Sequence, residues 1–205
     1  MTHYRLAVLV GLVGLTATGR VFAAPQPQFK IVVNIENYAQ VEKSALHTAT
    51  RETARIFGQM GVEIEWRERW VPLPGDGSVL AFSVVMLSPQ MAAEKANRDG
   101  VADRTLATSS KTTGRAYVFY ERLLRFAQQD ELDEGLMLGY TLMHELGHMT
   151  ANLPHDDVGI MNEFLELRQS GFLRFTREQQ VAIRTVLANA MKTGAPLFAL
   201  RSLPR

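Results

Sequence analysis

Residues 135–151, "GLMLGYTLMHELGHMTA", are followed at once by "NLPHDDVGIMN" (152–162). The first stretch is strongly apolar, yet it holds two histidines four residues apart, His144 and His148. Residues at this spacing lie on one face of an α-helix, about 5–6 Å apart at Cβ. Two imidazoles at this spacing can coordinate one metal ion. The stretch therefore predicts an apolar helix, with its histidines buried, that carries a metal site.

Glu145 completes the motif HExxH over residues 144–148. In this motif the glutamate beside the first ligand points at the open position of a catalytic zinc ion, where it can take a proton from water. A chain of this length contains the motif by chance with a probability of about one per cent or less. The residues therefore predict zinc (Zn²⁺) on His144 and His148, with Glu145 as general base. The alternative is a pair of surface histidines on an amphipathic helix.

A catalytic zinc ion usually takes three protein ligands. The downstream candidates are His155, Asp156, Asp157, Glu163 and Glu166. His155 follows Asn152, which tolerates a left-handed conformation, and Pro154, which blocks further helix. The chain can therefore turn back and bring His155 to the metal, and imidazole suits zinc. His155 is the predicted third ligand, and a glutamate from a later segment stays open as the alternative.

The residues after His155 predict a turn beneath the site. Gly159 allows a tight turn, and Met161 would then place an apolar side chain just after the last ligand, which is compatible with an ordinary core methionine. Asp156 or Asp157 could orient a ligand imidazole or be solvated loop charges. Tyr140, one turn before His144, is expected in the core. His47 stands alone and is not expected to bind metal.

The overall composition is that of a soluble globular protein. Apolar residues make up 46% of the 205-residue chain and charged residues 21%, with a formal net charge of +1. This charge gives no reason to expect nucleic acid or an anionic membrane as partner. Cysteine is absent, so only His, Asp or Glu could hold a metal ion.

The N-terminal residues have the pattern of a signal peptide. A basic segment, "MTHYR", precedes the apolar run "LAVLVGLVGLTATG" and the small residues of "RVFAAP". The run is shorter than the roughly 20 residues of a spanning helix, although a retained anchor is the alternative. We expect residues 1–23 to be removed after Ala23. Residues 24–205 would then form one secreted or periplasmic catalytic domain without stable membrane insertion, taken to be a monomer.

Periodicity predicts the remaining elements. Strands are expected over 29–38, 62–70, 78–88 and 115–123, and helices over 39–60 and 176–192. The last helix has Thr176 and Gln179 as a capping box. Its apolar residues are expected to form mostly one stripe: Val181, Ile183, Val186, Leu187 and Met191. Residues 71–77 and 89–114 are expected to be loops, the second a long surface connection.

These motifs resemble the metzincin clan of zinc metallopeptidases, whose pattern is HExxHxxGxxH followed by a methionine turn. The matching residues are His144, Glu145, His148, His155 and Met161. One additional residue separates the second and third histidines here, and Asn152 replaces the clan's glycine. The chain is closer to uncharacterised bacterial secreted proteins with metzincin-like sites, through "GIM" at 159–161 and "FTREQQVAIR" at 175–184. The resemblance covers roughly residues 101–190.

The resemblance implies an α+β fold. This fold consists of a twisted mixed β-sheet packed with helices, an active-site helix, and a small C-terminal helical part below the cleft. It also implies an edge strand that pairs with extended substrate, for which 115–123 or the segment before it is the candidate.

The predicted function is that of an exported zinc metalloendopeptidase acting on protein or peptide substrates. Glu145 would assist the attack of water and pass the proton to the leaving amine. The alternatives are a non-enzymatic zinc protein whose site is closed by Asp157 or Glu163, and a zinc amidase acting on cell-wall peptides.

Overall fold

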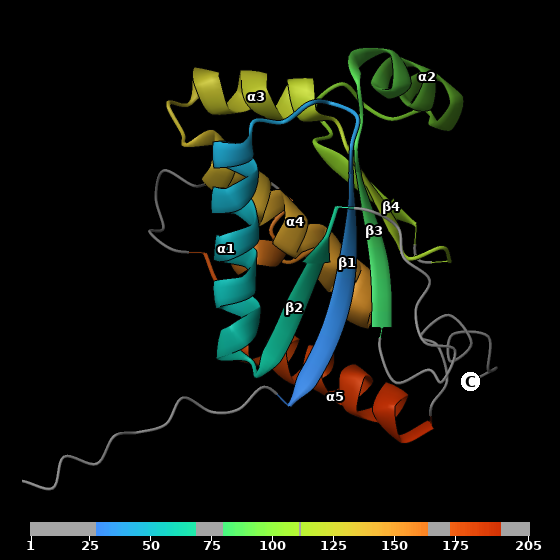
Figure 1. Cartoon of the computed structure of the whole chain (residues 1–205), viewed down its shortest axis with the longest axis vertical. Coiled ribbons are helices and arrows are strands. Elements are labelled where there is room, and N and C mark those ends of the chain that lie inside the picture. The colour runs from blue at the N-terminus through green and yellow to red at the C-terminus, as the bar shows by residue number, and fades with distance from the viewer. Residues whose placement is uncertain (1–27, 69–79, 111, 164–172, 194–205) are drawn as a thin grey trace, which may run out of the picture.

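The computed structural model describes residues 28–68, 80–110, 112–163 and 173–193, and these residues form an α+β fold (Figure 1). The strands are β1 (Phe29–Asn37), β2 (Val62–Arg67), β3 (Leu80–Met86), β4 (Ala107–Ser110) and β5 (Arg115–Val118). The α-helices are α1 (Lys43–Gln59), α2 (Pro89–Asp99), α3 (Tyr120–Gln129), α4 (Glu134–Ala151) and α5 (Arg177–Thr193), with a 3-10 turn, η1, at Gly159–Met161. The expected fold class, a mixed sheet packed with helices, is confirmed.

The sheet has the strand order β2-β1-β3-β5-β4. Strand β1 pairs in parallel with β2 and β3, β3 pairs in parallel with β5, and β4 is antiparallel to β5. Parallel neighbours need a crossover connection, and α1 supplies it between β1 and β2. Among the described residues, the antiparallel strand β4 lies at an edge of the sheet, and no described strand pairs with the other side of its backbone.

The core lies between the sheet and the pair α1 and α4. Helix α4 is buried along almost its whole length, as its apolar composition predicts. It lies very close to α1: a β-carbon on Gly135 would stand 2.7 Å from Thr48 Cβ, and one on Gly139 would stand 3.2 Å from the Ala49 carbonyl oxygen. Small residues at these positions allow the two backbones to approach.

The expectation that 89–114 is a loop was wrong. Residues 89–99 form α2 and residues 107–110 form β4. Ser88 caps α2 by accepting a hydrogen bond from Met91 N, and Gly100 ends it in a left-handed conformation with φ 64°. These are ordinary helix boundaries. The helix has no fully buried residue, and it meets the core through the partly buried Met91, Ala92 and Ala96, which give only a weak apolar period.

The three largest further differences in element boundaries, each of three residues or more, are the following. The strand predicted over 115–123 ends at Val118, and helix α3 begins at Tyr120. Helix α1 begins at Lys43 rather than residue 39, because Gln40 has a positive φ of 55°. Strand β2 ends at Arg67 rather than residue 70, and residues 69–70 lie outside the described residues.

Helix α5 begins with the predicted capping box. Thr176 Oγ1 accepts from Gln179 N at 3.3 Å, and Gln179 Oε1 accepts from Thr176 N at 3.0 Å. The predicted apolar stripe is only partly correct. Ile183 and Leu187 are buried, whereas Val181 and Met191 are more than half exposed, because only the face toward α4 finds a packing partner.

Some predictions lie outside the described residues: the signal peptide over 1–23, the loop over 71–77, and Glu166 as a ligand. Within the part of the chain that the structure describes, no helix combines the length and the apolar character needed to cross a membrane.

Candidate metal centre

Helix α4 presents the two histidines of the motif at its C-terminal end. The helix is capped by Asp133, whose carboxylate accepts from Leu136 N at 2.8 Å. It ends at Asn152, which adopts the left-handed conformation with φ 54° and ψ 37°, as predicted. This turn directs the chain back toward the helix face that carries His144 and His148. Both rings are half-buried rather than fully buried, since one side of each faces a cleft.

Backbone carbonyl groups orient both helix histidines. The Nδ1 atom of His144 lies 2.8 Å from the Ile160 carbonyl oxygen, and that of His148 lies 2.6 Å from the Leu153 carbonyl oxygen. A carbonyl oxygen can only accept, so both Nδ1 atoms carry the proton. In a neutral ring Nε2 is then the unprotonated nitrogen, and the two Nε2 atoms face each other at 3.0 Å.

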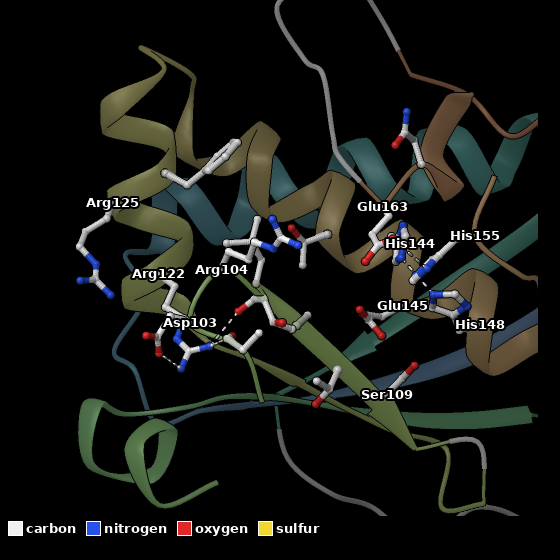
Figure 2. A pocket seen from close by; sticks show the side chains of 18 of the residues that line it. Asp103, Arg104, Ser109, Arg122, Arg125, His144, Glu145, His148, His155 and Glu163 are labelled. Carbon is white, nitrogen blue, oxygen red and sulfur yellow. Dashed lines mark hydrogen bonds and ion pairs between the residues drawn. The ribbon is translucent and has the colours of Figure 1, made fainter. Parts of the chain in front are cut away.

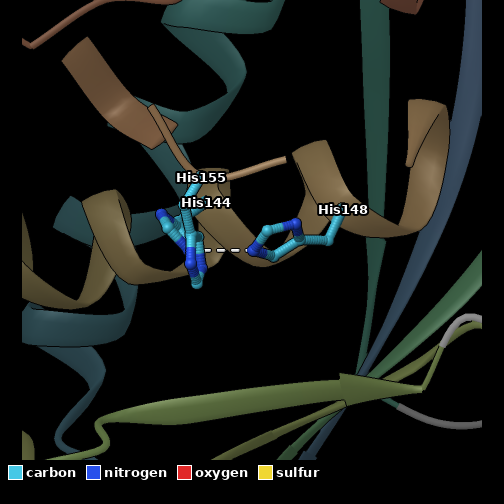
Figure 3. A group of neighbouring side chains, drawn as sticks. All are labelled: His144, His148 and His155. Carbon is cyan, nitrogen blue, oxygen red and sulfur yellow. Dashed lines mark hydrogen bonds between the residues drawn. The ribbon is translucent and has the colours of Figure 1, made fainter. Parts of the chain in front are cut away.

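His155 joins this pair from the loop after α4 (Figure 3). Its ring centroid lies 5.1 Å from that of His144 and 5.0 Å from that of His148. One ligand atom from each of the three histidines lies within 4.8 Å of the others, so the group could hold a metal ion. The structure thus brings together the three residues that the sequence predicted as ligands.

The chemistry of these nitrogens fits a metal ion. With both Nδ1 protons donated to carbonyls, the facing Nε2 atoms of His144 and His148 are two acceptors in contact when both rings are neutral. They then repel each other unless a cation, either a metal ion or a proton, lies between them. Two nitrogens at the usual zinc distance of about 2.0–2.1 Å in a tetrahedral site stand about 3.4 Å apart, close to the 3.0 Å observed. Burial also lowers the pKa of His144 to about 4, so that its ring is neutral and able to bind metal.

The turn after His155 lies directly beneath the helix. Gly159 has a φ of 72°, and a β-carbon there would stand 2.5 Å from the Arg174 carbonyl oxygen. Met161 is fully buried, and its sulfur packs against Gly147 between the two helix histidines. The same turn supplies the carbonyl of Ile160 that orients His144. The methionine predicted here is therefore a core residue that supports the histidine pair.

Glu145 has a carboxylate that is almost fully buried and faces the cleft (Figure 2). Among the described residues, its Oε2 atom has no hydrogen-bond partner. Burial raises the pKa of Glu145 to about 7, while hydrogen bonding by the Ser109 hydroxyl acts in the opposite direction. An unpartnered carboxylate oxygen beside three imidazoles is costly for folding, which is typical of a group kept for function.

A cleft of about 1510 Å³ leads away from the three histidines. It runs along β4 and the segment before it on one side, and along α3 and α4 on the other (Figure 2). Arg122 of α3 holds the segment before β4 by donating to the carbonyl oxygens of Ala102 at 2.7 Å and Thr105 at 3.2 Å. One wall of the cleft is therefore the edge strand β4, and the segment that precedes this strand is held in place by Arg122.

Strand β4 turns part of its backbone toward the open edge. The Leu106 and Ser110 carbonyls accept from residues on the β5 side, Phe119 and Gly114. In an antiparallel ladder alternate residues face the partner, so the N–H and C=O groups of Ala107 and Ser109 face outward. Sequence reasoning missed β4 because "ATSS" is short and only weakly apolar. The candidate 115–123 was wrong as the edge, and the segment before it is the edge.

The other sequence candidates do not join the histidine group. Asp156 accepts from Gln179 Nε2 at 2.9 Å and so ties the loop to α5. Asp157 is exposed, and Tyr140 is buried in the core, as expected. His47 lies exposed on α1.

No protein-family model matches this chain, and no curated protein matches it.

Proposed function

We propose that this protein is an exported zinc-dependent metallopeptidase. The observation that supports the proposal most strongly is the pair of Nε2 atoms of His144 and His148, oriented by backbone carbonyls and facing each other at 3.0 Å. A third imidazole, from His155, adjoins the pair. Three imidazoles and no thiolate form a donor set that suits zinc.

Each residue has a distinct role in the proposed reaction. His144, His148 and His155 would hold the metal, and zinc bound there would act as a Lewis acid that polarises a carbonyl and acidifies a water molecule. Glu145 accepts the proton of the attacking water through its buried carboxylate. The same carboxyl then delivers the proton to the leaving amine nitrogen as the peptide bond breaks. Met161 supports the histidines from behind and takes no part in the proton transfer.

The cleft favours an extended peptide as substrate. Its wall is the edge strand β4, whose Ala107 and Ser109 direct backbone donors and acceptors outward. An extended chain can add to such an edge through main-chain hydrogen bonds. A peptide bound in this way would run past the carboxylate of Glu145. This arrangement favours peptide hydrolysis over a closed, purely structural site.

Export is the second part of the proposal, and it rests on the sequence of residues 1–23 with cleavage after Ala23. An exported enzyme would meet protein or peptide substrates in a periplasm or outside the cell. Expression with the N-terminal segment, followed by N-terminal sequencing of the mature product, tests this. A mature chain that begins at Met1 in the membrane fraction would contradict it.

The proposed activity is tested with purified protein and a Glu145→Gln variant. We expect the protein to bind about one zinc ion and to hydrolyse peptide bonds in a mixed peptide substrate, with loss of activity on chelation and recovery on adding zinc. Glu145→Gln should bind zinc as the parent does and lose about 10²–10⁴-fold in turnover. Glu121→Gln, on the exposed face of α3, is the matched control.

Full turnover by Glu145→Gln would refute the proposed mechanism. Zinc bound tightly without cleavage of any peptide would instead favour the non-enzymatic alternative. Cleavage confined to cell-wall peptides in a substrate panel would favour the amidase.

A further inference from the structure

The third histidine differs from the other two in how it is held. The two helix histidines donate Nδ1–H to backbone carbonyl oxygens. His155 has no hydrogen bond to the backbone of the described residues. Its Nδ1 atom instead lies 3.8 Å from Oε2 of Glu163, and Figure 2 shows the two side chains together at the cleft.

The loop between these two residues is closed by its own hydrogen bonds. Asp156 N donates to the Met161 carbonyl oxygen at 2.9 Å, and Asp156 forms a β-bridge with Asn162. Asn162 Nδ2 also donates to the Asp157 carbonyl oxygen at 3.0 Å. The bridge is parallel, so it closes the loop without pairing residue 155 with residue 163. The closed loop holds the two segments near each other, and the closeness of His155 and Glu163 is shown by their own 3.8 Å contact.

Burial does not hold the His155 ring in place. The side chain of His155 is 48% exposed and that of Glu163 is 62% exposed. An exposed imidazole keeps much of its rotational freedom, which a metal site must remove on binding. A hydrogen-bond acceptor next to Nδ1 would reduce that cost and leave Nε2 as the unprotonated nitrogen.

We infer that Glu163 is a positioning residue for His155: its carboxylate accepts the Nδ1 proton and keeps Nε2 directed at the point shared with His144 and His148. This inference rests on the metal site of the proposed function. The observed 3.8 Å is longer than a charge-assisted hydrogen bond of about 2.7–2.9 Å, and a small rotation of the exposed carboxylate closes it. A carboxylate behind a ligand imidazole makes the ligand more basic and orients it.

The competing role for Glu163 is that of a fourth metal ligand, which would close the site. Within the described residues, the group able to share a metal ion consists of the three histidines and includes no carboxylate. The Glu163 carboxylate stands beside Nδ1, on the side of the ring that carries the proton when Nε2 is the ligand. With Nε2 as the ligand, this position lies behind the imidazole rather than beside the metal.

Zinc affinity measured by competition with a chromophoric chelator tests this role without any use of catalysis. We expect Glu163→Ala to weaken zinc binding by about 10–100-fold, the range found for partners of ligand histidines. Glu163→Gln should show a smaller loss, because its amide oxygen still accepts the Nδ1 proton but carries no charge. Asp157→Ala, which removes an exposed carboxylate from the same loop, should stay within about twofold of the parent chain.

Visible absorption of the cobalt-substituted protein separates positioning from ligation. The same coordination number in the parent and in Glu163→Ala is expected, whereas a lower one in the variant would make Glu163 a ligand and overturn the inference. Unchanged zinc affinity in Glu163→Ala would also overturn it, and so would a parent chain that binds no zinc. A parent that binds zinc, loses affinity on this substitution and cleaves no peptide would refute the proposed function alone.

Discussion

Gly147 and Met161 are in such close contact that a β-carbon on Gly147 would lie 2.7 Å from the Met161 sulfur. The same β-carbon would stand 3.2 Å from Phe175 and 3.4 Å from Leu153. Gly147 lies between His144 and His148 on the helix, and Met161 ends the turn whose Ile160 carbonyl orients His144. The contact therefore sets the distance between the histidine pair and the turn beneath it.

Gly147→Ala is expected to destabilise the protein although alanine favours a helix. Overpacking of a filled core costs about 1–3 kcal/mol, which exceeds the gain in helix propensity of about 1 kcal/mol. The turn should also move away from the helix and weaken zinc binding. Urea unfolding and the chelator competition measure the two effects. Unchanged stability and affinity would mean that Met161 rotates aside freely.

The left-handed residue after α4 gives a second prediction. Asn152 is exposed, and its φ of 54° suits glycine or asparagine. Asn152→Gly should be close to neutral in stability, whereas Asn152→Val should cost about 1–2 kcal/mol because of its β-branched side chain. The valine variant should also weaken zinc binding, since the next carbonyl, that of Leu153, orients His148. Equal stabilities of the two variants would contradict this account.

A third prediction compares two glycines in helices. A β-carbon on Gly135 of α4 would stand 2.9 Å from the Ala45 carbonyl oxygen, a backbone atom that cannot rotate away, whereas one on Gly58 of α1 would meet nothing within 4 Å. Gly135→Ala should therefore destabilise the protein by about 1–3 kcal/mol. Gly58→Ala should stabilise it by about 0.5–1 kcal/mol. Thermal and urea unfolding measure the change in the free energy of unfolding of each variant. A stabilising Gly135→Ala would show that α1 and α4 can move apart at no cost in free energy.

Gln179 links α5 to the loop that carries His155, because it contacts both Thr176 and Asp156. A substitution that changes its charge distinguishes the effects of these two contacts. Gln179→Glu keeps the capping box with Thr176, but it replaces the donor to Asp156 with a second carboxylate. We expect a loss of about 1–3 kcal/mol in stability and weaker zinc binding. The double variant Gln179→Glu with Asp156→Asn restores a donor and an acceptor in exchanged positions and should recover most of the loss. If the double variant did not recover stability, the loss in Gln179→Glu would not come from the hydrogen bond to Asp156.

The local parts of the site could be predicted from the sequence. The helix geometry brings His144 and His148 onto one face wherever the helix packs, and Asn152 with Pro154 ends that helix by backbone preference alone. The capping box of Thr176 and Gln179 is likewise a contact between near neighbours. Such features depend on φ, ψ and short-range hydrogen bonds, which the residues themselves specify.

The missed parts depend on contacts between distant segments. Helix α2 was missed because it buries no side chain completely, so that its residues carry no clear period. The exposure of Val181 and Met191 was missed because an apolar residue on a helix is buried only where another element covers it. The outward backbone of Ala107 and Ser109 depends on which strand ends at the edge of the sheet, and pairing order is not encoded in a short segment.

By itself, then, the sequence determined a capped apolar helix with a histidine pair and a carboxylate, a turn after it, and an α+β pattern. Only the tertiary structure decided that His155 meets the pair, that Glu163 lies beside His155, and that an edge strand borders the cleft. The physical reason is the range of the interactions: the first set follows from torsion angles and neighbours along the chain, whereas the second exists only after the closed loop 156–162, α5 and the sheet have packed around α4.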